Sequence, residues 1–346
     1  MKCSFQKYNL QFKEAGTTSR GTLLQKETFI LTLADKGRLA YGECNLFRGL
    51  AFDDRRGYEE KLAEVCDALS IRRWDMLEEL TAWPSIRFGV ETVLRDADNG
   101  FRRVIFKEIV PEDGFTLPAN GLIWMGPDDV MKKRIEEKLQ QGYKNIKLKI
   151  GALDFEREVG LLRYIRNHEK GSGVTIRLDA NGAFGPQEAL EKLKRLSDFG
   201  IEYLEQPIRQ GMWQEMAAII EKSPIPIALD EELIGINSHD EKVKLIDTLR
   251  PPFLVLKPAL TGGFASCDEW NQLAKRASGE CVITSALESN IGLNAIAQYT
   301  ATLNPVRPQG LGTGTLFTNN FGSPYLTDAL GLHYDPLRSW DLSLLS

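Results

Sequence analysis

The sequence contains little histidine and cysteine. Its 346 residues include three histidines and five cysteines, and no two cysteines have the C-x-x-C spacing. Three histidines argue against a histidine-rich metal site. The number of cysteines is odd, and their spacing fits neither a disulfide framework nor a zinc site. We therefore expect reduced thiols in a cytoplasmic protein.

Long apolar runs and an excess of positive charge are also absent. No apolar run approaches the roughly 20 residues that cross a bilayer, and residues 1–7 lack the apolar core of a signal peptide. The net charge of −5, with both signs mixed along the chain, provides no basic surface for nucleic acid. We expect a globular protein with neither a membrane nor a nucleic-acid partner.

Short apolar runs and amphipathic segments alternate regularly from about residue 118 onward. In residues 187–199, for example, apolar residues recur at helical spacing, and Gly200 follows where a helix would end. Strands that alternate with helices pair in parallel through right-handed crossovers. The apolar runs lie at 121–123, 146–150, 176–179, 203–205, 227–230, 254–257 and 282–285, with a weaker one at 310–311.

A charged residue ends several of these runs at a nearly constant interval. Asp179, Glu205, Asp230 and Lys257 follow one another after 26, 25 and 27 residues. About eight such units in roughly 200 residues predict an α/β fold, a TIM-like (β/α)-barrel at 118–321. An open doubly wound sheet is the alternative, but the chain lacks the glycine fingerprint that such a sheet usually carries.

The first 117 residues have a different pattern. Residues 29–33, the turn residues 35–37 and residues 39–41 predict a β-hairpin, and a helical run follows at 58–69. We therefore expect an α+β segment before the barrel. The tail at 322–346 lacks the period of the barrel, and we expect it to pack back onto the fold.

Three of the charges at the strand ends are carboxylates. A strand buried on both faces should carry no charge unless that charge is paired or binds a metal. The carboxyl ends of barrel strands converge, so Asp179, Glu205 and Asp230 would repel one another without a cation between them. Oxygen ligands alone favour Mg²⁺, with Mn²⁺ as the alternative. In the competing interpretation each carboxylate pairs with a neighbouring helix, which three acids in register disfavour.

Three lysines are predicted to share this end of the barrel. Lys147 and Lys149 are two residues apart on one strand, so both side chains point to the same face. The apolar residues between and beside them belong to the face under the helices, and the lysines therefore point inward. Lys257 ends a strand on the opposite side of the barrel. Charge alternation on an exposed strand is the competing explanation of the Lys-x-Lys pattern.

Lysines on both sides of a divalent cation suit the removal of a proton next to a carboxylate. The carbon beside a carboxylate is a weak acid, and its carbanion must be stabilised as an enediolate. A cation held by three carboxylates stabilises the charge that develops on the substrate. Neighbouring positive charges lower the pKa of a lysine from about 10.4, which allows it to act as a base. We predict an enzyme that acts on a small-molecule carboxylate.

These residues resemble those of the enolase superfamily, in particular its muconate-lactonizing subgroup. The resemblance covers nearly the whole chain, and it is strongest to the o-succinylbenzoate synthases of menaquinone biosynthesis. The motifs are highly specific for the superfamily and only moderately specific for the reaction. They are Lys147-Leu148-Lys149, Asp179-Ala180-Asn181, Glu205-Gln206-Pro207, Asp230-Glu231, Lys257-Pro258, 284–289 and 310–313, together with 19–21, 42–44 and 88–91 before the barrel.

The resemblance implies a cap over the mouth of the barrel and a metal site beneath it. Residues 1–117 would form the cap, completed by the tail at 322–346. The metal ligands by position would be Asp179, Glu205 and Asp230.

The lysines also take their roles from the resemblance. Lys149 would remove the α-proton and return it to the departing hydroxyl, which gives a syn dehydration. Lys257 would steady the enediolate from the opposite face, and Lys147 would tune Lys149.

Five further residues are candidates for binding the substrate. Arg20, in the loop at 16–20, would reach a carboxylate, and Asn181 would support the site from behind. Thr284, Ser285 and the backbone at Gly310 would hold the succinyl end of the substrate. A solvated loop arginine, a turn cap at Asn181 and the ordinary polar lip of a barrel are the competing explanations.

The resemblance leaves other reactions open. Dipeptide epimerases and N-succinylamino acid racemases would reprotonate from the other side, using Lys149 and Lys257, and muconate cycloisomerases keep the lysines. Dipeptide epimerases usually carry an Asp-x-Asp pair at the eighth strand, where residues 310–314 contain no acid. A mandelate-type racemase would need a histidine where Thr284 and Ser285 stand. A barrel that only binds is the alternative from another class, and the sequence does not indicate the oligomeric state.

Overall fold

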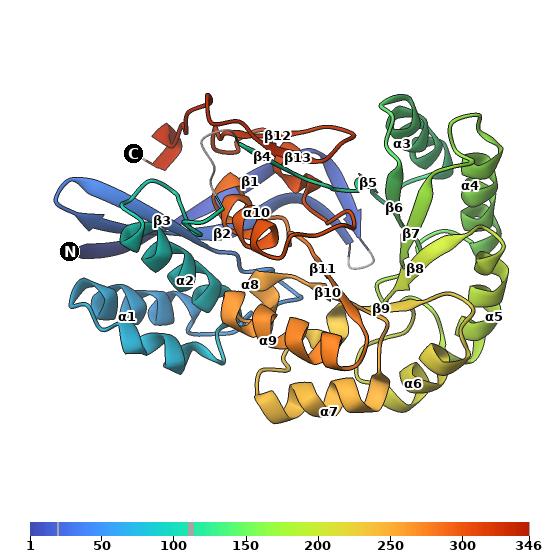
Figure 1. Ribbon diagram of the computed structural model, residues 1–346, viewed down its shortest axis with the longest axis horizontal. Coiled ribbons are helices and arrows are strands. Elements are labelled where there is room, and N and C mark those ends of the chain that lie inside the picture. Colours follow the sequence, from blue (N-terminus) through green and yellow to red (C-terminus); the bar gives the residue numbers. More distant parts are fainter. Residues whose placement is uncertain (19–20, 110–113, 346) are drawn as a thin grey trace.

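The computed structural model describes residues 1–18, 21–109 and 114–345. In Figure 1 the blue N-terminal elements form a lobe beside a ring of strands and helices coloured green to orange. The last, red part of the chain returns to the blue lobe. A parallel barrel with an antiparallel sheet before it confirms the predicted fold class.

A three-stranded antiparallel sheet forms the centre of the cap. Its strands, in spatial order, are β1 (Lys2–Thr18), β2 (Gly21–Asp35) and β3 (Arg38–Cys44). The predicted hairpin is β2–β3, and its turn residues Lys36 and Gly37 both have the positive φ that a tight hairpin requires. The helical elements that pack with this sheet are α1 (Tyr58–Ser70), η1 (Trp74–Leu80) and α2 (Pro84–Asp98).

Seven parallel strands form the wall of the barrel, each hydrogen-bonded to its neighbour in the chain. Residues such as Leu148 and Leu178 point outward into the main core under the helices. A separate cluster of five apolar residues, Tyr203 among them, fills the interior. The strands are β5 (Gly121–Ile123), β6 (Asn145–Lys149), β7 (Thr175–Asp179), β8 (Ile201–Glu205), β9 (Ile227–Leu229), β10 (Phe253–Leu256) and β11 (Glu280–Ile283).

Two residues close the barrel at its eighth position. Gln309 forms a parallel bridge to Ala119, just before β5, and Gly310 forms one to Thr284, just after β11. Position 310 requires glycine, because a Cβ there would lie 2.1 Å from Thr284 Oγ1. The weak apolar run at 310–311 therefore begins at the seam of the ring.

The helices of the barrel lie outside its strands. Their first turns use local capping: Ser238 and Glu241 form a capping box on α7, and the Ser289 hydroxyl accepts a hydrogen bond at the start of α10. The helical elements are α3 (Asp128–Gln140), α4 (Phe155–Asn167), α5 (Pro186–Ser197), α6 (Trp213–Lys222), η2 (Glu231–Leu233), α7 (His239–Leu249), α8 (Pro258–Thr261), α9 (Gly263–Arg276), α10 (Asn290–Thr302) and η3 (Gly312–Thr315).

The C-terminal segment packs against the cap and the start of the barrel. A small antiparallel sheet has the order β12-β13-β4, and Trp340 and Leu342 pack against Ile30 and Tyr41 of the cap sheet. The boundaries 1–117, 118–321 and 322–346 stay a prediction. The elements of this segment and its partner strand are β4 (Phe115–Leu117), β12 (Tyr325–Thr327), β13 (Leu332–Tyr334) and η4 (Ser343–Leu345).

Two expectations from composition concern membranes and thiols. Within the described ranges, no helix is long and apolar enough to cross a lipid bilayer. All five cysteines are free thiols, as predicted.

Candidate active site

Parallel register brings the charged strand ends side by side. Lys149, Asp179 and Glu205 are direct neighbours across β6, β7 and β8. Asp230 directly follows β9, and Lys257 directly follows β10. The carboxyl ends of these strands therefore carry the six predicted acids and lysines, including Lys147 one inward position below Lys149.

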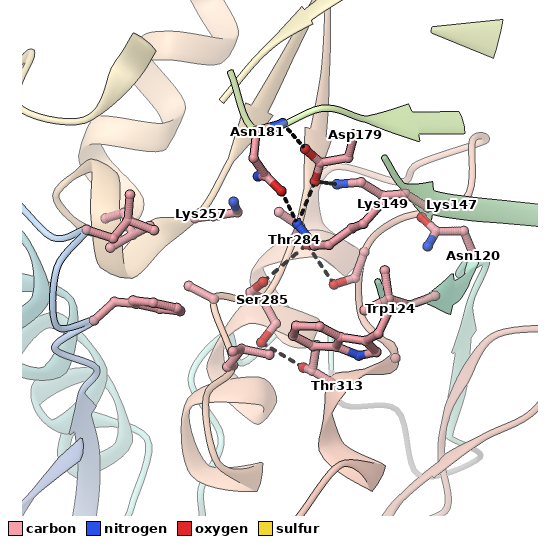
Figure 2. A pocket seen from close by; sticks show the side chains of 18 of the residues that line it. Asn120, Trp124, Lys147, Lys149, Asp179, Asn181, Lys257, Thr284, Ser285 and Thr313 are labelled. Atoms are coloured by element: carbon pink, nitrogen blue, oxygen red, sulfur yellow. Dashed lines mark hydrogen bonds and ion pairs between the residues drawn. The ribbon is translucent and has the colours of Figure 1, made fainter. Parts of the chain in front are cut away.

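Ion pairs join these acids and lysines into two groups. Lys147 Nζ lies 3.0 Å from Asp179 Oδ2 and 2.5 Å from Glu205 Oε2, and Lys149 Nζ lies 2.9 Å from Asp179 Oδ2. On the other side, Lys257 Nζ contacts Asp230 Oδ2. Figure 2 shows Lys257 and Lys147 entering the site from opposite sides of the view.

Burial and mutual repulsion set the protonation of the carboxylates. Burial opposes the charge of Asp179, but Lys147, Lys149 and Lys257 outweigh it and hold its pKa well below the usual range. Glu205 has the opposite balance, because burial and the negative charge of Asp179 raise its pKa well above the usual range despite Lys147. One of two adjacent acids is thus strongly ionised while the other resists ionisation.

The same acids raise the pKa values of two of the lysines. Burial disfavours the charge of Lys147, but Asp179 and Glu205 more than compensate and raise its pKa well above the ordinary value. Burial likewise opposes the charge of Lys257, yet Asp230 and Glu205 raise its pKa. Both ammonium groups therefore remain charged at neutral pH.

The donor set fits a hard divalent cation, although the described residues contain no group of three His, Cys, Asp or Glu side chains gathered as an ion cage. The ammonium groups of the lysines lie between the carboxylates instead. Glu205 Oε1 is buried without a hydrogen-bond partner in the described part of the chain, and such an atom is unfavourable unless it gains a ligand. All three acids offer oxygen, which Mg²⁺ prefers.

Asn181 lies next to the lysine that the sequence predicts to be the base. Its φ is +45°, and its backbone N–H donates to Asp179 Oδ1 at 3.1 Å. Its side-chain Oδ1 accepts from Lys149 Nζ at 2.8 Å, and its Nδ2 donates to Glu231 Oε1 at 3.0 Å. The amide is therefore part of the site and not merely a turn cap.

The other predicted binding residues lie at the seam of the barrel. Thr284 Oγ1 donates to Gly310 O at 3.0 Å, and the Ser285 hydroxyl accepts from Thr313 Oγ1 at 2.7 Å (Figure 2). All of them line the same pocket as the lysines. Arg20 lies outside the described residues.

One pocket is lined by the three lysines, Asp179, Asn181, Thr284, Ser285 and Gly310, whereas Glu205 and Asp230 are not among its lining residues. Sequence reasoning missed several of its residues. Glu231 could have been noticed as a second acid directly after a buried strand, but the others carry no chemical pattern in the sequence. The missed lining residues are Phe47 and Leu50 from the cap, Asn120, Leu122 and Trp124 around β5, and Glu231, Leu260, Ala286, Leu287, Gly312 and Thr313.

A buried hydrogen-bond network ties the pocket to the cap. Glu288 Oε2 accepts from the Ser285 hydroxyl and from Ala286 N, and its Oε1 accepts from Asn45 Nδ2 at 2.7 Å. Lys26 Nζ donates to the other end of the Asn45 side chain. The cap is thus linked directly to the end of β11.

A barrel with acids and lysines at the carboxyl ends of its strands, beneath a cap, defines a capped (β/α)-barrel enzyme. Residues 130–321 match the family described as Enolase C-terminal domain-like. The chain belongs to the enolase superfamily.

Two relatives show the range of reactions among similar chains. The chain is 41% identical to an o-succinylbenzoate synthase of Desulfotalea psychrophila, over 95% of this chain and 97% of the relative. It is 26% identical to the L-Ala-D/L-Glu epimerase of Bacillus subtilis, over 82% of this chain and 80% of that protein.

Solved structures agree with this assignment. The crystal structure of MenC from Desulfotalea psychrophila has a TM-score of 0.84 and 38% identity, covering 96% of this chain and 99% of that one. The o-succinylbenzoate synthase of Thermosynechococcus elongatus, complexed with Mg in its active site, has a TM-score of 0.71 and 24% identity, covering 90% and 92%. At that identity the second structure supports the fold alone.

Proposed function

We propose that the chain is an o-succinylbenzoate synthase, which dehydrates 2-succinyl-6-hydroxy-2,4-cyclohexadiene-1-carboxylate in menaquinone biosynthesis. The observation that carries the proposal is a single pocket lined by Lys149, Lys257 and the buried Asp179. The identity of 41% to the Desulfotalea synthase over nearly the full length supports this choice of reaction.

Asp179, Glu205 and Asp230 are the residues proposed to hold a divalent cation. We propose Mg²⁺, because carboxylate oxygens are its preferred protein ligands and the Thermosynechococcus synthase contains it. When bound, the cation would stabilise negative charge that develops on the substrate carboxylate. Mn²⁺ has similar ligand preferences and is the alternative.

Lys149 is the proposed base for both proton transfers. Its neutral amine takes the proton from the carbon next to the carboxylate, and the electrons of that C–H bond pass into the enediolate. The hydroxyl on the neighbouring carbon then leaves, and the Lys149 ammonium returns the proton to it as water. Because one group serves both steps, the proton and the hydroxyl depart from the same face of the ring.

Lys257 is proposed to act as a fixed cation. Burial opposes its charge, but its contact with Asp230 and the nearby Glu205 raise its pKa. A lysine that stays protonated can stabilise an anion on the opposite face of the substrate, but it is a poor base. Lys147, held by Asp179 and Glu205, is proposed to tune Lys149 through its positive charge.

The remaining pocket residues are proposed to select the substrate. Trp124 and Leu122 offer an apolar wall for the ring, and Thr284, Ser285 and the backbone at Gly310 offer polar groups for the succinyl end. Arg20 is proposed to reach a substrate carboxylate.

A direct assay tests the proposed function. The purified protein is incubated with Mg²⁺ and the cyclohexadiene substrate, and the loss of ultraviolet absorbance is followed. In parallel, N-succinyl amino acids are incubated in D₂O, and deuterium at the α-carbon is measured. Turnover of the first substrate is expected, and its absence in the metal-loaded protein would contradict the proposal.

N-succinylamino acid racemization is the second candidate. Lysines on two sides of one pocket are the arrangement that a two-base racemization requires. Dipeptides are less suitable substrates, because residues 310–314 offer no acid for their ammonium group. Deuterium exchange without dehydration would favour this second candidate.

We also propose the division of labour among the parts of the chain. Residues 1–117 act as the cap, 118–321 as the catalytic barrel, and 322–346 as a tail that completes the cap. The five free thiols are compatible with a reducing compartment, and we propose the cytoplasm.

A further inference from the structure

Glu231 lies directly after the proposed metal ligand Asp230, and only 3% of its surface is exposed. Its Oε1 accepts a hydrogen bond from Asn181 Nδ2 at 3.0 Å. At the other end of the same amide, Asn181 Oδ1 accepts from Lys149 Nζ at 2.8 Å. The three side chains form a hydrogen-bonded chain from η2 to the end of β6, and Figure 2 shows the contact between Asn181 and Lys149.

The orientation of the Asn181 amide decides what Lys149 meets. An amide has a donor end and an acceptor end of nearly the same shape. If the group turned over, its Nδ2 would face the amino group of Lys149. It would then either meet the donors of an ammonium or occupy the lone pair that a neutral amine needs as a base. Glu231 Oε1 accepts from Asn181 Nδ2 in this structure, and this contact favours the orientation in which Nδ2 points toward Glu231.

The amine of Lys149 donates to two acceptors, Asn181 Oδ1 and Asp179 Oδ2, and the second of these is also a proposed metal ligand. The distance from Lys149 Nζ to Asp179 Oδ2 is 2.9 Å. Asn181 Oδ1 is then the acceptor that can direct the amine toward the substrate.

We propose that Glu231 is a positioning residue for the reaction: it fixes the amide of Asn181 and, through it, the direction of the Lys149 amine. This inference rests on the proposed role of Lys149 as the base. It adds to the site a carboxylate that needs no contact with the substrate or the cation for its effect.

The next residue offers a matched control. Glu232 is also buried, with 4% of its surface exposed, and it too is a carboxylate in η2. Its oxygens accept from Gln206 Nε2 at 3.1 Å and from Gly211 N at 2.8 Å, not from Asn181. A change at Glu232 therefore removes a buried carboxylate of η2 without touching the chain to Lys149.

A double-mutant cycle in kcat tests the proposal. Glu231→Ala and Asn181→Ala should each lower kcat by roughly 10- to 100-fold with KM changed less than about threefold. The double variant should be no slower than the slower single variant, because both changes break the same chain. Glu231→Gln keeps an acceptor oxygen but also has a donor end, so its rate should lie between those of Glu231→Ala and the parent protein. Losses that multiply, or a Glu231→Gln variant slower than Glu231→Ala, would overturn the proposal.

If Glu231→Ala does not fold, exchanging the amide at position 181 with the carboxylate at position 231 provides a second test. Asn181→Asp alone places two carboxylates against each other. Adding Glu231→Gln restores a donor to face the new acid, whose second oxygen can accept from Lys149. The combined variant should be at least about tenfold faster than Asn181→Asp alone, and a combined variant that is no faster would refute the proposal.

A measurement without substrate separates this inference from the proposed function. Acetylation of Lys149 by acetic anhydride is followed by mass spectrometry at one pH, with the exposed Lys133 as the internal reference. Lys149 should react several-fold faster in Glu231→Ala than in the parent protein, and its rate should not change in Glu232→Ala. An unchanged rate in Glu231→Ala would defeat the inference even in an active enzyme. A parent protein that fails to dehydrate the substrate would defeat only the proposed function.

Discussion

The barrel contains two clusters of paired charge, one at each end of its strands. The upper cluster consists of Lys147, Lys149, Asp179, Glu205, Asp230 and Lys257 at the carboxyl ends. The lower cluster consists of Arg177, Glu202, Arg307 and Glu280 toward the amino ends. In the lower cluster Glu202 pairs with Arg177 at 2.6 Å and with Arg307 at 2.7 Å, and Arg307 also pairs with Glu280 at 2.6 Å, so the ion pairs join each acid to an arginine. In the upper cluster acids also face acids, and burial together with Asp179 and Asp230 raises the pKa of Glu205.

The choice of cation separates the two clusters further. Arginine stays charged at any pH of interest and binds through a planar fork, whereas lysine can release its proton in a suitable site. Arg177 is fully buried, donates to Pro308 O at 2.6 Å and lies 4.9 Å from the ring centre of Tyr203. We infer that the arginine cluster holds the barrel together, while the lysine cluster, which borders the pocket, carries out the chemistry.

Loss of the proposed base should have the largest effect of all. Lys149→Ala should lower kcat by about 10²- to 10⁴-fold, because a general base typically contributes that much. Substrate should still bind, as measured by fluorescence titration, and the free energy of unfolding should change little. Retention of more than about a tenth of the rate would show that Lys149 is not the base.

Substitutions in the lower cluster should lower the free energy of unfolding and leave kcat nearly unchanged. Arg177→Met leaves Glu202 partly buried beside Arg307 alone, and we expect the free energy of unfolding to fall by about 3 kcal/mol. Urea unfolding gives this value, and the kcat of the folded enzyme should stay within about threefold. Arg307→Met, whose parent side chain is 42% exposed, is the control and should cost about 1 kcal/mol or less. A large loss of kcat in folded Arg177→Met would erase the distinction between the clusters.

Metal should stabilise the protein through the upper cluster only. At a Mg²⁺ concentration 100 times the Kd, the free energy of unfolding should rise by about 2.7 kcal/mol. Thermal unfolding with Mg²⁺ and with a chelator measures this increase. Glu205→Gln should remove the response, whereas Glu202→Gln should keep it. If Mg²⁺ still stabilised Glu205→Gln, the metal would have to bind away from these acids.

Acid should lower the free energy of unfolding through the lower cluster. Burial opposes the ionisation of Glu202, but Arg177 and Arg307 outweigh it and hold its pKa below the usual 4.5. The unfolded chain therefore binds the proton more readily. The contribution of Glu202 is complete above pH 4.5 and is lost as the pH falls through the lower, folded-state value. We expect the free energy of unfolding to fall as the pH drops below 4.5 and this fall to be absent in Glu202→Gln, as measured by urea unfolding at several pH values.

The barrel and its charged strand ends could be predicted because they depend on local periodicity. Lys147 and Lys149 face inward since strand side chains alternate, and the apolar residues between and beside them do lie in the core under the helices. The constant spacing predicted that Asp179 and Glu205 lie at the same level along the barrel axis, and the register of β7 and β8 confirms this. Both inferences need only the chain's own neighbours in sequence.

The walls of the pocket could not be predicted in the same way. Phe47 and Leu50 reach the pocket from the cap, more than 90 residues before Lys147, and nothing in their local pattern differs from ordinary core residues. Asn120 accepts from Arg177 of the lower cluster and also lines the pocket. Such double contacts depend on tertiary packing, which the period of the sequence does not encode.

Closure of the barrel by Gln309 and Gly310 has a consequence for the order of assembly during translation. β5 emerges from the ribosome long before the segment that must lie beside it, so the ring stays open until residue 310 has been made. β1, the earliest strand of all, pairs through Phe12 with Phe317, seven residues further on. The first and the last parts of this chain therefore complete each other, and a nascent protein stopped before residue 309 would display two unpaired strand edges.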